Sequence, residues 1–379
     1  MEKNNNIISA TQIGIIGYFL GNAFFVGMGN LNINELVNQD AWISGIISIL
    51  ICLIPIGFLL YIINYQPDKN ILEKNKIIFG KWLGQFVNII ISLYVFLIFV
   101  ILLWATTNYS VVIYLTDTPK WFITSLFLIV IIYTVVKGIE TIARTSEILF
   151  LIANIMMIII VLGLLKHSSF YNVKPIMRDG VIPVLKGSIL YLAYSFPPLL
   201  SLLIIPKKNI KNEKKFNKYL LGGFIFSIIT MVIVFYINIS VITTNLTDLY
   251  RLPSYYVLKK IVITDYFNNI ENYISIHWFL PLLVTMIMCL YFLSEYIKQT
   301  FKIQKKKYMN LSIIVIAAIA GIVSNYLFKN GTDSLVFMGK TFPYLISLII
   351  LAILVITSII IYIKKKIQKN NNQEYEKEI

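Results

Sequence analysis

Long apolar runs separated by short polar segments dominate the chain. A helix needs about 20 residues to cross the hydrocarbon core of a bilayer, and runs of that length recur along the whole sequence. The pattern predicts an all-α membrane protein of ten transmembrane helices. The predicted spans are 13–31, 42–63, 82–115, 121–137, 141–165, 182–205, 219–243, 273–300, 311–328 and 341–363.

The first and the sixth of these spans are interrupted in the middle. Gly21 and Asn22 interrupt the first, with more glycines at positions 27 and 29, and the segment 194–198 interrupts the sixth with two prolines. Proline removes a backbone donor and glycine weakens a helix. Hydrocarbon cannot pair with the freed backbone groups, so such breaks persist only where protein, ligand or water does. Matching breaks in two five-span halves predict a binding site at the membrane midplane.

The distribution of charge predicts the orientation of the chain. It has 379 residues, of which 58% are hydrophobic and 13% charged, and the net charge of +15 comes from Lys in short loops. If the N-terminus is cytoplasmic, more than two thirds of the 33 Lys and Arg residues lie inside. We therefore expect one domain with both termini cytoplasmic, and no removable signal peptide. Its expected parts are an N-terminus (1–12), a first repeat (13–165), a second repeat (182–363) and a tail (364–379).

Two further features have simple interpretations. Cys52 and Cys289 lie inside apolar spans and are expected to be packing residues. The segment 244–272, expected outside, is either a surface loop or a short helical lid over an outward-facing vestibule.

Several local motifs resemble a known family. Residues 11–14, 20–23 and 38–44 (Asn-Gln-Asp-Ala-Trp-Ile-Ser) resemble the opening of the spore germination permeases. Residues 138–148 (Gly-Ile-Glu-Thr-Ile-Ala-Arg-Thr-Ser-Glu-Ile) resemble the entry to that family's fifth span, and residues 174–197 resemble its sixth. The resemblance covers essentially the whole chain.

This resemblance implies a fold and a set of partners. The fold is that of the amino acid/polyamine/organocation transporters, a five-plus-five inverted repeat with discontinuous helices 1 and 6. The implied protein is the B subunit of an endospore nutrient germinant receptor in the spore inner membrane. Its implied partners are a small nutrient ligand, the lipid bilayer, a larger membrane A-type subunit and a lipoprotein C-type subunit, with no nucleic acid.

The sequence departs from related proteins at two positions that bear on the ligand. Many family members carry an acidic residue just after the break in the sixth span, where this chain has apolar Pro198, Leu199 and Leu200. Proton-coupled relatives use a lysine in the fifth span, whereas Asn154 is the one polar residue in the middle of this one. A neutral amino acid, small or apolar, is therefore the expected ligand, and ion coupling is not evident.

The expected ligand-binding residues follow from the two breaks and from the third and eighth spans. Gly21 has two interpretations: backbone exposed to a ligand, or a glycine at a helix–helix contact. Side chains on the third and eighth spans have packing as their alternative role. The expected set is Gly21, Asn22, Tyr94, Tyr194, Ser195, Phe196, Pro197, Thr285 and Met288.

The charged residues within spans suggest ion pairs or a gate. Arg144 and Glu147 lie three residues apart, as do Glu295 and Lys298, so a local pair is expected for each. The two histidines have no metal-ligand partners at suitable spacing, and the sequence has no catalytic motif, so neither a metal, a cofactor nor an enzymatic activity is expected.

Three functions remain open at this stage. The leading one is a ligand-sensing transmembrane subunit that triggers germination when it binds a small neutral nutrient such as an amino acid. The alternatives are an amino-acid secondary transporter, and a structural subunit of a receptor complex with a degenerate pocket.

Overall fold

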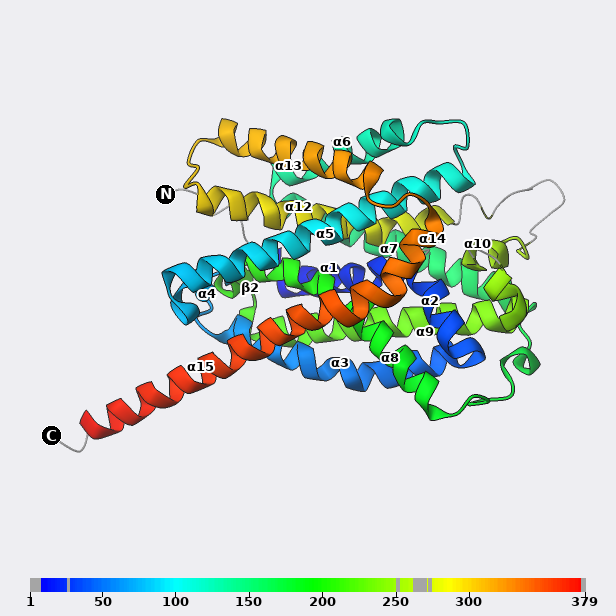
Figure 1. The fold of residues 1–379 in the computed structure, drawn as a ribbon, viewed down its shortest axis with the longest axis horizontal. Helices are drawn as coiled ribbons and strands as arrows, with labels where there is room; N and C mark the ends of the chain where they lie inside the picture. Colours follow the sequence, from blue (N-terminus) through cyan, green and yellow to red (C-terminus); the bar gives the residue numbers. More distant parts are fainter. Residues whose placement is uncertain (1–7, 26–27, 250–252, 262–270, 272–274, 376–379) are drawn as a thin grey trace.

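The computed structural model describes residues 8–25, 28–249, 253–261, 271 and 275–375, and the side chains of all of these except 28, 244–249 and 371–375. It is a bundle of long helices that run roughly side by side (Figure 1). The long helices are α3 (Ala41–Asn64), α5 (Lys81–Ile113), α6 (Lys120–Lys137), α7 (Ile139–Leu165), α9 (Phe216–Leu249), α12 (Phe279–Thr300), α13 (Lys306–Tyr326) and α15 (Ser347–Tyr375).

The first span is broken close to the predicted position. Helix α1 (Ala10–Asn22) passes into a 3-10 turn, η1 (Ala23–Phe25), and the chain resumes as α2 (Met28–Val37). Gly27, one of the glycines noted above, lies outside the described residues. Another 3-10 turn, η2 (Asn38–Asp40), leads into α3.

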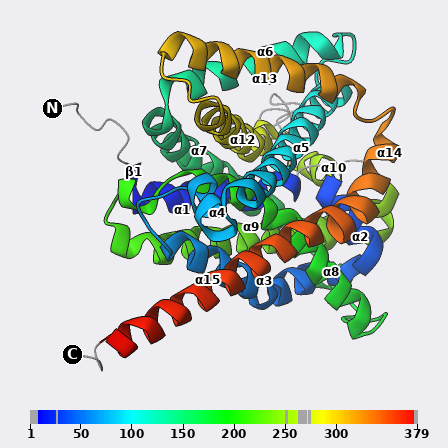
Figure 2. The same cartoon turned by 60° about the vertical axis from the view of Figure 1, so that its left-hand side comes forward.

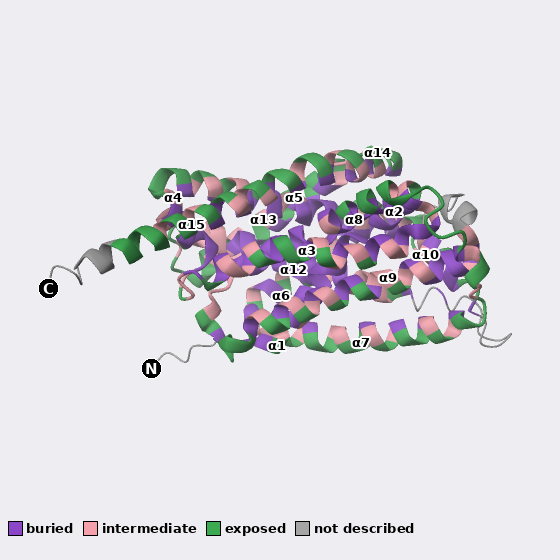
Figure 3. Ribbon diagram, turned by 90° about the horizontal axis from the view of Figure 1, so that it is seen from below, coloured by how far each residue is buried: buried purple, intermediate pink, exposed green. Residues whose placement is uncertain are grey.

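The sixth span is broken at the predicted prolines. Helix α8 (Val181–Ser195) ends where Pro197 begins a 3-10 helix, η4 (Pro197–Ile204). Proline cannot donate the next α-helical hydrogen bond, so the helix changes type there. Within Val181–Ile204, 89% of the most apolar stretch of 18 residues is buried, whereas the corresponding stretch of α7 is 22% buried. The broken span is therefore central, and Figure 3 shows the exposed outer surface of α7.

Nine helical segments of the described chain are long and apolar enough to cross a membrane. The first of them begins at Gly29 and merges α2 with α3, because the break leaves α1 and α2 each too short to qualify. Ten spans thus remain a prediction. Helix α5 has 33 residues, which at about 1.5 Å each is about 50 Å against about 30 Å of hydrocarbon. It runs obliquely across the bundle, as its length requires (Figure 1).

The outer layer exposes apolar side chains. Helices α6 and α13 pack side by side at one edge of the bundle (Figure 2). Ile129 on α6 and Ile322 on α13 are each more than half exposed, and many other apolar side chains on these two helices are exposed as well. Such a surface suits lipid rather than water.

Glycines allow α1 to approach α9 closely. A Cβ added at Gly14 would lie 2.6 Å from the carbonyl oxygen of Tyr219, and one at Gly223 would meet the Gly14 oxygen. A Cβ at Gly17 would lie 2.9 Å from Leu220. The two helices therefore pack backbone to backbone, as small residues permit in membranes.

Short elements close one end of the bundle. Strand β1 (Ile8–Ser9) pairs in parallel with β2 (Ile210–Lys211). This pairing joins the chain before α1 to the segment after the sixth span. That segment also has two 3-10 turns, η5 (Lys207–Asn209) and η6 (Glu213–Lys215). Ser9 and Gln12 form a capping box at the start of α1.

A buried lysine caps the end of α3. On α4 (Ile71–Phe79), the Nζ of Lys74 donates to the carbonyls of Ile62 at 3.0 Å and Ile63 at 2.9 Å. Burial lowers the pKa of Lys74 to about 8. The last carbonyls of a helix lack intrahelical donors, and this ammonium supplies them.

The remaining elements lie at the opposite end or lead into α15. They are the 3-10 turns η3 (Phe170–Val173) and η7 (Ile276–Trp278), the helices α10 (Pro253–Leu258) and α14 (Gly331–Val336), and a π-helical segment (Phe337–Ile346). The predicted tenth span begins inside this π-helical segment, around Pro343.

Candidate functional site

A cavity lies beside the break in the first span. It has a volume of about 50 Å³. It is surrounded by α1, α2, α5, α7, α9, α10 and the start of α12. None of the described lining residues is Asp, Glu, Lys or Arg. The lining residues are Tyr18, Asn22, Phe25, Asn30, Tyr109, Ala153, Met157, Thr230, Met231, Val234, Pro253, Ser254, Tyr255, His277, Trp278 and Pro281.

Asn22 lines this cavity, and its side chain has an acceptor without a partner among the described residues. It is the last residue of α1 and is 1% exposed, and its Oδ1 has no hydrogen-bond partner among the described residues. Its side chain and that of Thr230 lie close to the Tyr18 hydroxyl. A buried acceptor without a partner is destabilising unless a ligand or water satisfies it, so this atom is suited to a ligand donor.

Aromatic rings form much of the cavity wall. Tyr109 packs edge-on against Trp278 and Phe279, with ring centroids 6.0 and 5.3 Å apart. Phe25, on the turn after Asn22, packs against Tyr191 and Tyr194 of α8. Phe25 therefore connects the cavity wall to the helix that carries the second break.

Helix α10 covers one side of the cavity. Ser254 Oγ accepts hydrogen bonds of 2.8 Å from Asn30 on α2 and of 2.8 Å from Asn238 on α9. Asn34 in turn donates to Asn30 at 3.2 Å. A second, smaller cavity of about 20 Å³ continues beneath Val257, toward the apolar cluster around α10.

These contacts bear on the two interpretations of the 244–272 segment. It contains a helix that covers a cavity, as the lid interpretation requires. Helix α9 is interrupted by a non-helical residue at Thr243, the predicted end of the seventh span, and then resumes as far as Leu249. Residues 250–252, 262–270 and 272–274 of the segment lie outside the described residues.

Gly21 and Asn22, adjacent in sequence, face different neighbours. Asn22 lines the cavity, but a Cβ at Gly21 would meet the Oγ of Ser227 on α9. Gly21 therefore lies at a helix–helix contact, the alternative role weighed for it.

Tyr194 and Ser195, at the second break, have their hydroxyls satisfied by backbone. The Tyr194 hydroxyl donates to the carbonyl of Met338 at 2.9 Å, and the Ser195 hydroxyl donates to Tyr191 at 2.7 Å. Met338 belongs to the π-helical segment, whose Phe342 packs 5.0 Å from Phe24. The π-helical segment thus contacts both breaks, and such segments often accompany functional sites.

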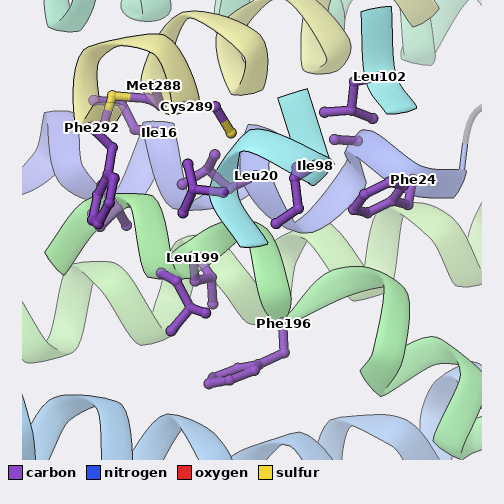
Figure 4. Packing of buried hydrophobic residues seen from close by; sticks show 14 of the residues in the cluster. Ile16, Leu20, Phe24, Ile98, Leu102, Phe196, Leu199, Met288, Cys289 and Phe292 are labelled. Atoms are coloured by element: carbon purple, nitrogen blue, oxygen red, sulfur yellow. The ribbon is translucent and has the colours of Figure 1, made fainter. Parts of the chain in front are cut away.

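The remaining predicted ligand residues lie in packed regions. Phe196, Pro197 and Met288 are buried, and Figure 4 shows Phe196 pointing away from Met288. Tyr94 stacks near Phe342, with centroids 6.3 Å apart, and the Thr285 hydroxyl donates to the carbonyl of Phe19 at 3.5 Å. Of the predicted set, only Asn22 is among the lining residues of this cavity. Ligand contact by the others remains a prediction.

The ion pairs agree with the sequence in one case and differ in the other. Glu295 and Lys298 pair at 3.1 Å, as predicted. The predicted partner of Arg144 was wrong, because Arg144 pairs with Glu140 one turn earlier, at 2.6 Å. Glu147 instead accepts a hydrogen bond of 3.1 Å from Gln12, which links α7 to α1.

The sequence contained a partial signal for the residues that were missed. Asn30, Thr230 and His277 are polar groups beside or within apolar spans, a placement that often marks a functional position. Tyr18, Phe25 and Trp278 gave no such signal, since aromatic residues are common in every span. Among the described residues, no cluster of His, Cys, Asp and Glu could hold a metal.

Known proteins with similar sequences are spore germination proteins. Spore germination protein YndE of Bacillus subtilis (strain 168) is 24% identical over 270 residues, covering 70% of this chain and 73% of YndE. Spore germination protein KB of the same organism is 26% identical over 283 residues, covering 72% of each.

Known structures with a similar fold are membrane transporters. MhsT, solved with L-phenylalanine, matches with a TM-score of 0.63 at 14% identity, over 90% of this chain and 88% of its own. Mhp1, a nucleobase-cation-symport-1 family transporter solved with bromovinylhydantoin, matches with a TM-score of 0.63 at 14% identity, over 88% and 75%. The chain therefore has the inverted-repeat transporter fold with discontinuous first and sixth helices, and it is a multi-pass membrane protein.

The family assignment rests on most of the chain. A sequence model of the family described as spore germination protein matches residues 8–329, which include both breaks, the cavity and α10. The chain belongs to the spore germination protein family.

Proposed function

We propose that this chain is the ligand-sensing transmembrane subunit of a spore germinant receptor, and that its ligand binds in the cavity beside Asn22. One observation carries the proposal: Asn22, whose buried acceptor oxygen has no partner among the described residues, lines a cavity at the break of the first span. Family membership supplies the biological setting.

The lining favours a small neutral nutrient such as an amino acid. An ionic side chain on the ligand would find no Asp, Glu, Lys or Arg among the described lining residues, and a buried unpaired charge is costly. The ligand's ammonium matches the Oδ1 of Asn22, and the aromatic rings suit an apolar side chain.

Ligand binding is proposed to act through the elements that meet at the cavity. A ligand that contacts α10 together with the packed pair of α1 and α9 favours the arrangement in which α10 is closed over it. The expected signal then passes to a larger membrane A-type subunit and a lipoprotein C-type subunit. The Lys and Arg distribution supports placing both termini on the cytoplasmic side of the spore inner membrane.

Spores that lack the chain, complemented with variants, test this proposal. Asn22→Leu removes the free acceptor, so we expect the nutrient dose–response to shift by about tenfold or more, the range expected for a lost buried hydrogen bond. Asn325→Leu on α13, whose amide bonds only its own helix at Gly321, is the matched control. Equal membrane levels of both variants must be shown by immunoblot. An unshifted response for Asn22→Leu would contradict the proposed site.

A secondary amino-acid transporter is the second candidate, because the fold is shared with MhsT and Mhp1. Uptake of labelled amino acids into proteoliposomes distinguishes the two functions. Accumulation that Asn22→Leu abolishes would favour transport. Loss of all nutrient responses on deletion, with no effect of any cavity variant, would instead favour a structural subunit with a degenerate pocket.

A further inference from the structure

An open groove runs along the outer surface between α3 and α15. It has a volume of about 590 Å³, and Ile54, Gly57 and Tyr61 of α3 face Ser358 and Tyr362 of α15 across it. A hollow of about 200 Å³ that also includes Ile54 extends it toward Leu192 of α8. Ile54 and Tyr362 are each more than 60% exposed, so the groove opens to the surroundings of the bundle.

The length of the groove matches one leaflet of a bilayer. From Ile51 to Tyr61 it follows α3 for about 15 Å at the helical rise of about 1.5 Å per residue, which is half of a ~30 Å hydrocarbon core. A partner helix would cross both leaflets, whereas an acyl chain occupies only one. Gly57 leaves the groove open, since no atom lies within 4 Å of a Cβ added there.

One end of the groove is basic. The Nζ of Lys365 lies 4.8 Å from the ring centroid of Tyr61, which lines the groove, and 5.7 Å from that of Tyr65. Lys207 donates to Asn64, the last residue of α3, at 2.6 Å. Lysines 364, 366 and 369 lie on the same end of α15. Positive charge beside an apolar groove at a membrane boundary matches the phosphate of an anionic lipid.

We propose that this groove binds an anionic phospholipid, with an acyl chain between α3 and α15 and its phosphate beside Lys365. The proposal needs only the lysine-rich end of α15 to lie at a bilayer boundary, and it is independent of the proposed sensing function.

The inner end of the site meets the second broken helix. Leu192 lines the hollow, and its carbonyl accepts the hydrogen bond of 3.1 Å from the N–H of Phe196 that closes α8. Ser195, between these two residues, approaches Cys52 of α3 at 4.0 Å. An acyl chain in the groove therefore contacts the helix turn that ends at the break.

Native mass spectrometry of the purified full chain tests the proposal with two lipids of identical acyl chains, phosphatidylglycerol and phosphatidylcholine. Gly57→Phe fills the groove, and we expect it to lower retention of both lipids. Gly222→Phe is its control, because Gly222 is exposed on α9 and also has no atom within 4 Å of an added Cβ. Lys365→Gln should weaken phosphatidylglycerol binding about fivefold and leave phosphatidylcholine unchanged. Lys307→Gln, at the start of α13, is its control.

The outcomes are distinct. Loss of both lipids in Gly57→Phe, together with loss of the phosphatidylglycerol preference in Lys365→Gln, supports the proposal. Retention of phosphatidylglycerol at the wild-type level by both variants overturns it. If Gly57→Phe keeps its lipids but releases a copurifying membrane protein, the groove is a docking site for a helix and the lipid proposal is wrong.

Discussion

The amide of Asn30 donates a hydrogen bond of 2.8 Å to the hydroxyl oxygen of Ser254. This bond joins α2, the second part of the broken first span, to α10, and Asn238 of α9 donates to the same oxygen. One hydroxyl thus holds three elements around the cavity. The position of α10 depends on a polar contact that a single substitution can remove.

Replacing Ser254 with alanine is expected to loosen α10. Two buried amide donors lose their acceptor, at a cost of about 1–3 kcal/mol. We expect faster hydrogen exchange of the 253–258 backbone, measured by mass spectrometry. Ser125→Ala is the control, because Ser125 is half-buried on α6 and its hydroxyl donates to Phe122 of its own helix. Unchanged exchange in Ser254→Ala would mean that apolar packing alone holds α10.

Substitutions at Gly21 separate packing from ligand contact. Gly21→Ala is expected to destabilise the protein by about 1–3 kcal/mol, because the added Cβ meets Ser227. Removing the opposing side chain in Gly21→Ala/Ser227→Gly should restore most of the thermal stability, measured by melting in detergent. A rescued double variant that still fails to respond to nutrient would show that Gly21 contacts the ligand after all.

The buried Lys74 predicts a specific dependence of stability on pH. Its pKa is lowered to about 8 in the folded protein from an ordinary 10.5, so the unfolded chain binds more protons between these values. The stability contributed by this group therefore rises as the pH increases from about 8 toward 10.5. Below pH 8, Lys74 is charged in the folded protein, and its burial disfavours that charge. We expect the melting temperature of the wild type, relative to Lys74→Met, to increase over this range. Lys81→Met is the control, and a constant difference between wild type and Lys74→Met would contradict the assignment.

Cysteine labelling tests the predicted orientation. Asn212 and Tyr171 are exposed and lie in segments that the charge distribution assigns to opposite sides. In a background with Cys52 and Cys289 replaced by alanine, single cysteines at these positions should react with an impermeant reagent from opposite faces. Both native cysteines are buried, so their replacement removes background without exposing new surface. Labelling of both sites from one face would exclude the ten-span topology.

The helices and their breaks were readily predicted from sequence, since each depends on local composition. The third span was predicted at 82–115 and lies at 81–113, and the prolines fix the end of α8 at Ser195. Apolar run length and proline chemistry act within one helix, so no knowledge of neighbours is needed. Helix α4 was missed although it has a local signal, the capping box of Asn70 and Glu73 at its start. The π-helical segment was missed because its sequence reads as part of an ordinary apolar span.

The candidate site was only partly predicted, because composition does not specify which side of a helix faces which neighbour. Asn22 and Gly21 are adjacent and share a break, yet one lines a cavity and the other packs on Ser227. Arg144 had acidic residues at both three and four positions' distance, and the sequence did not distinguish them. Thr230 and Tyr109 come from distant segments that only the folded bundle brings together.

The glycine contact between α1 and α9 has a practical consequence for spectroscopy. The backbones of α1 and α9 are in contact at Gly14 and Gly223, so one helix cannot slide along the other without a steric clash. The two helices therefore form a rigid pair. Spin labels at the exposed Thr11 and Tyr219 would therefore report a fixed separation in every ligand state. This pair can serve as an internal ruler, against which any displacement of the other helices in the membrane can be measured.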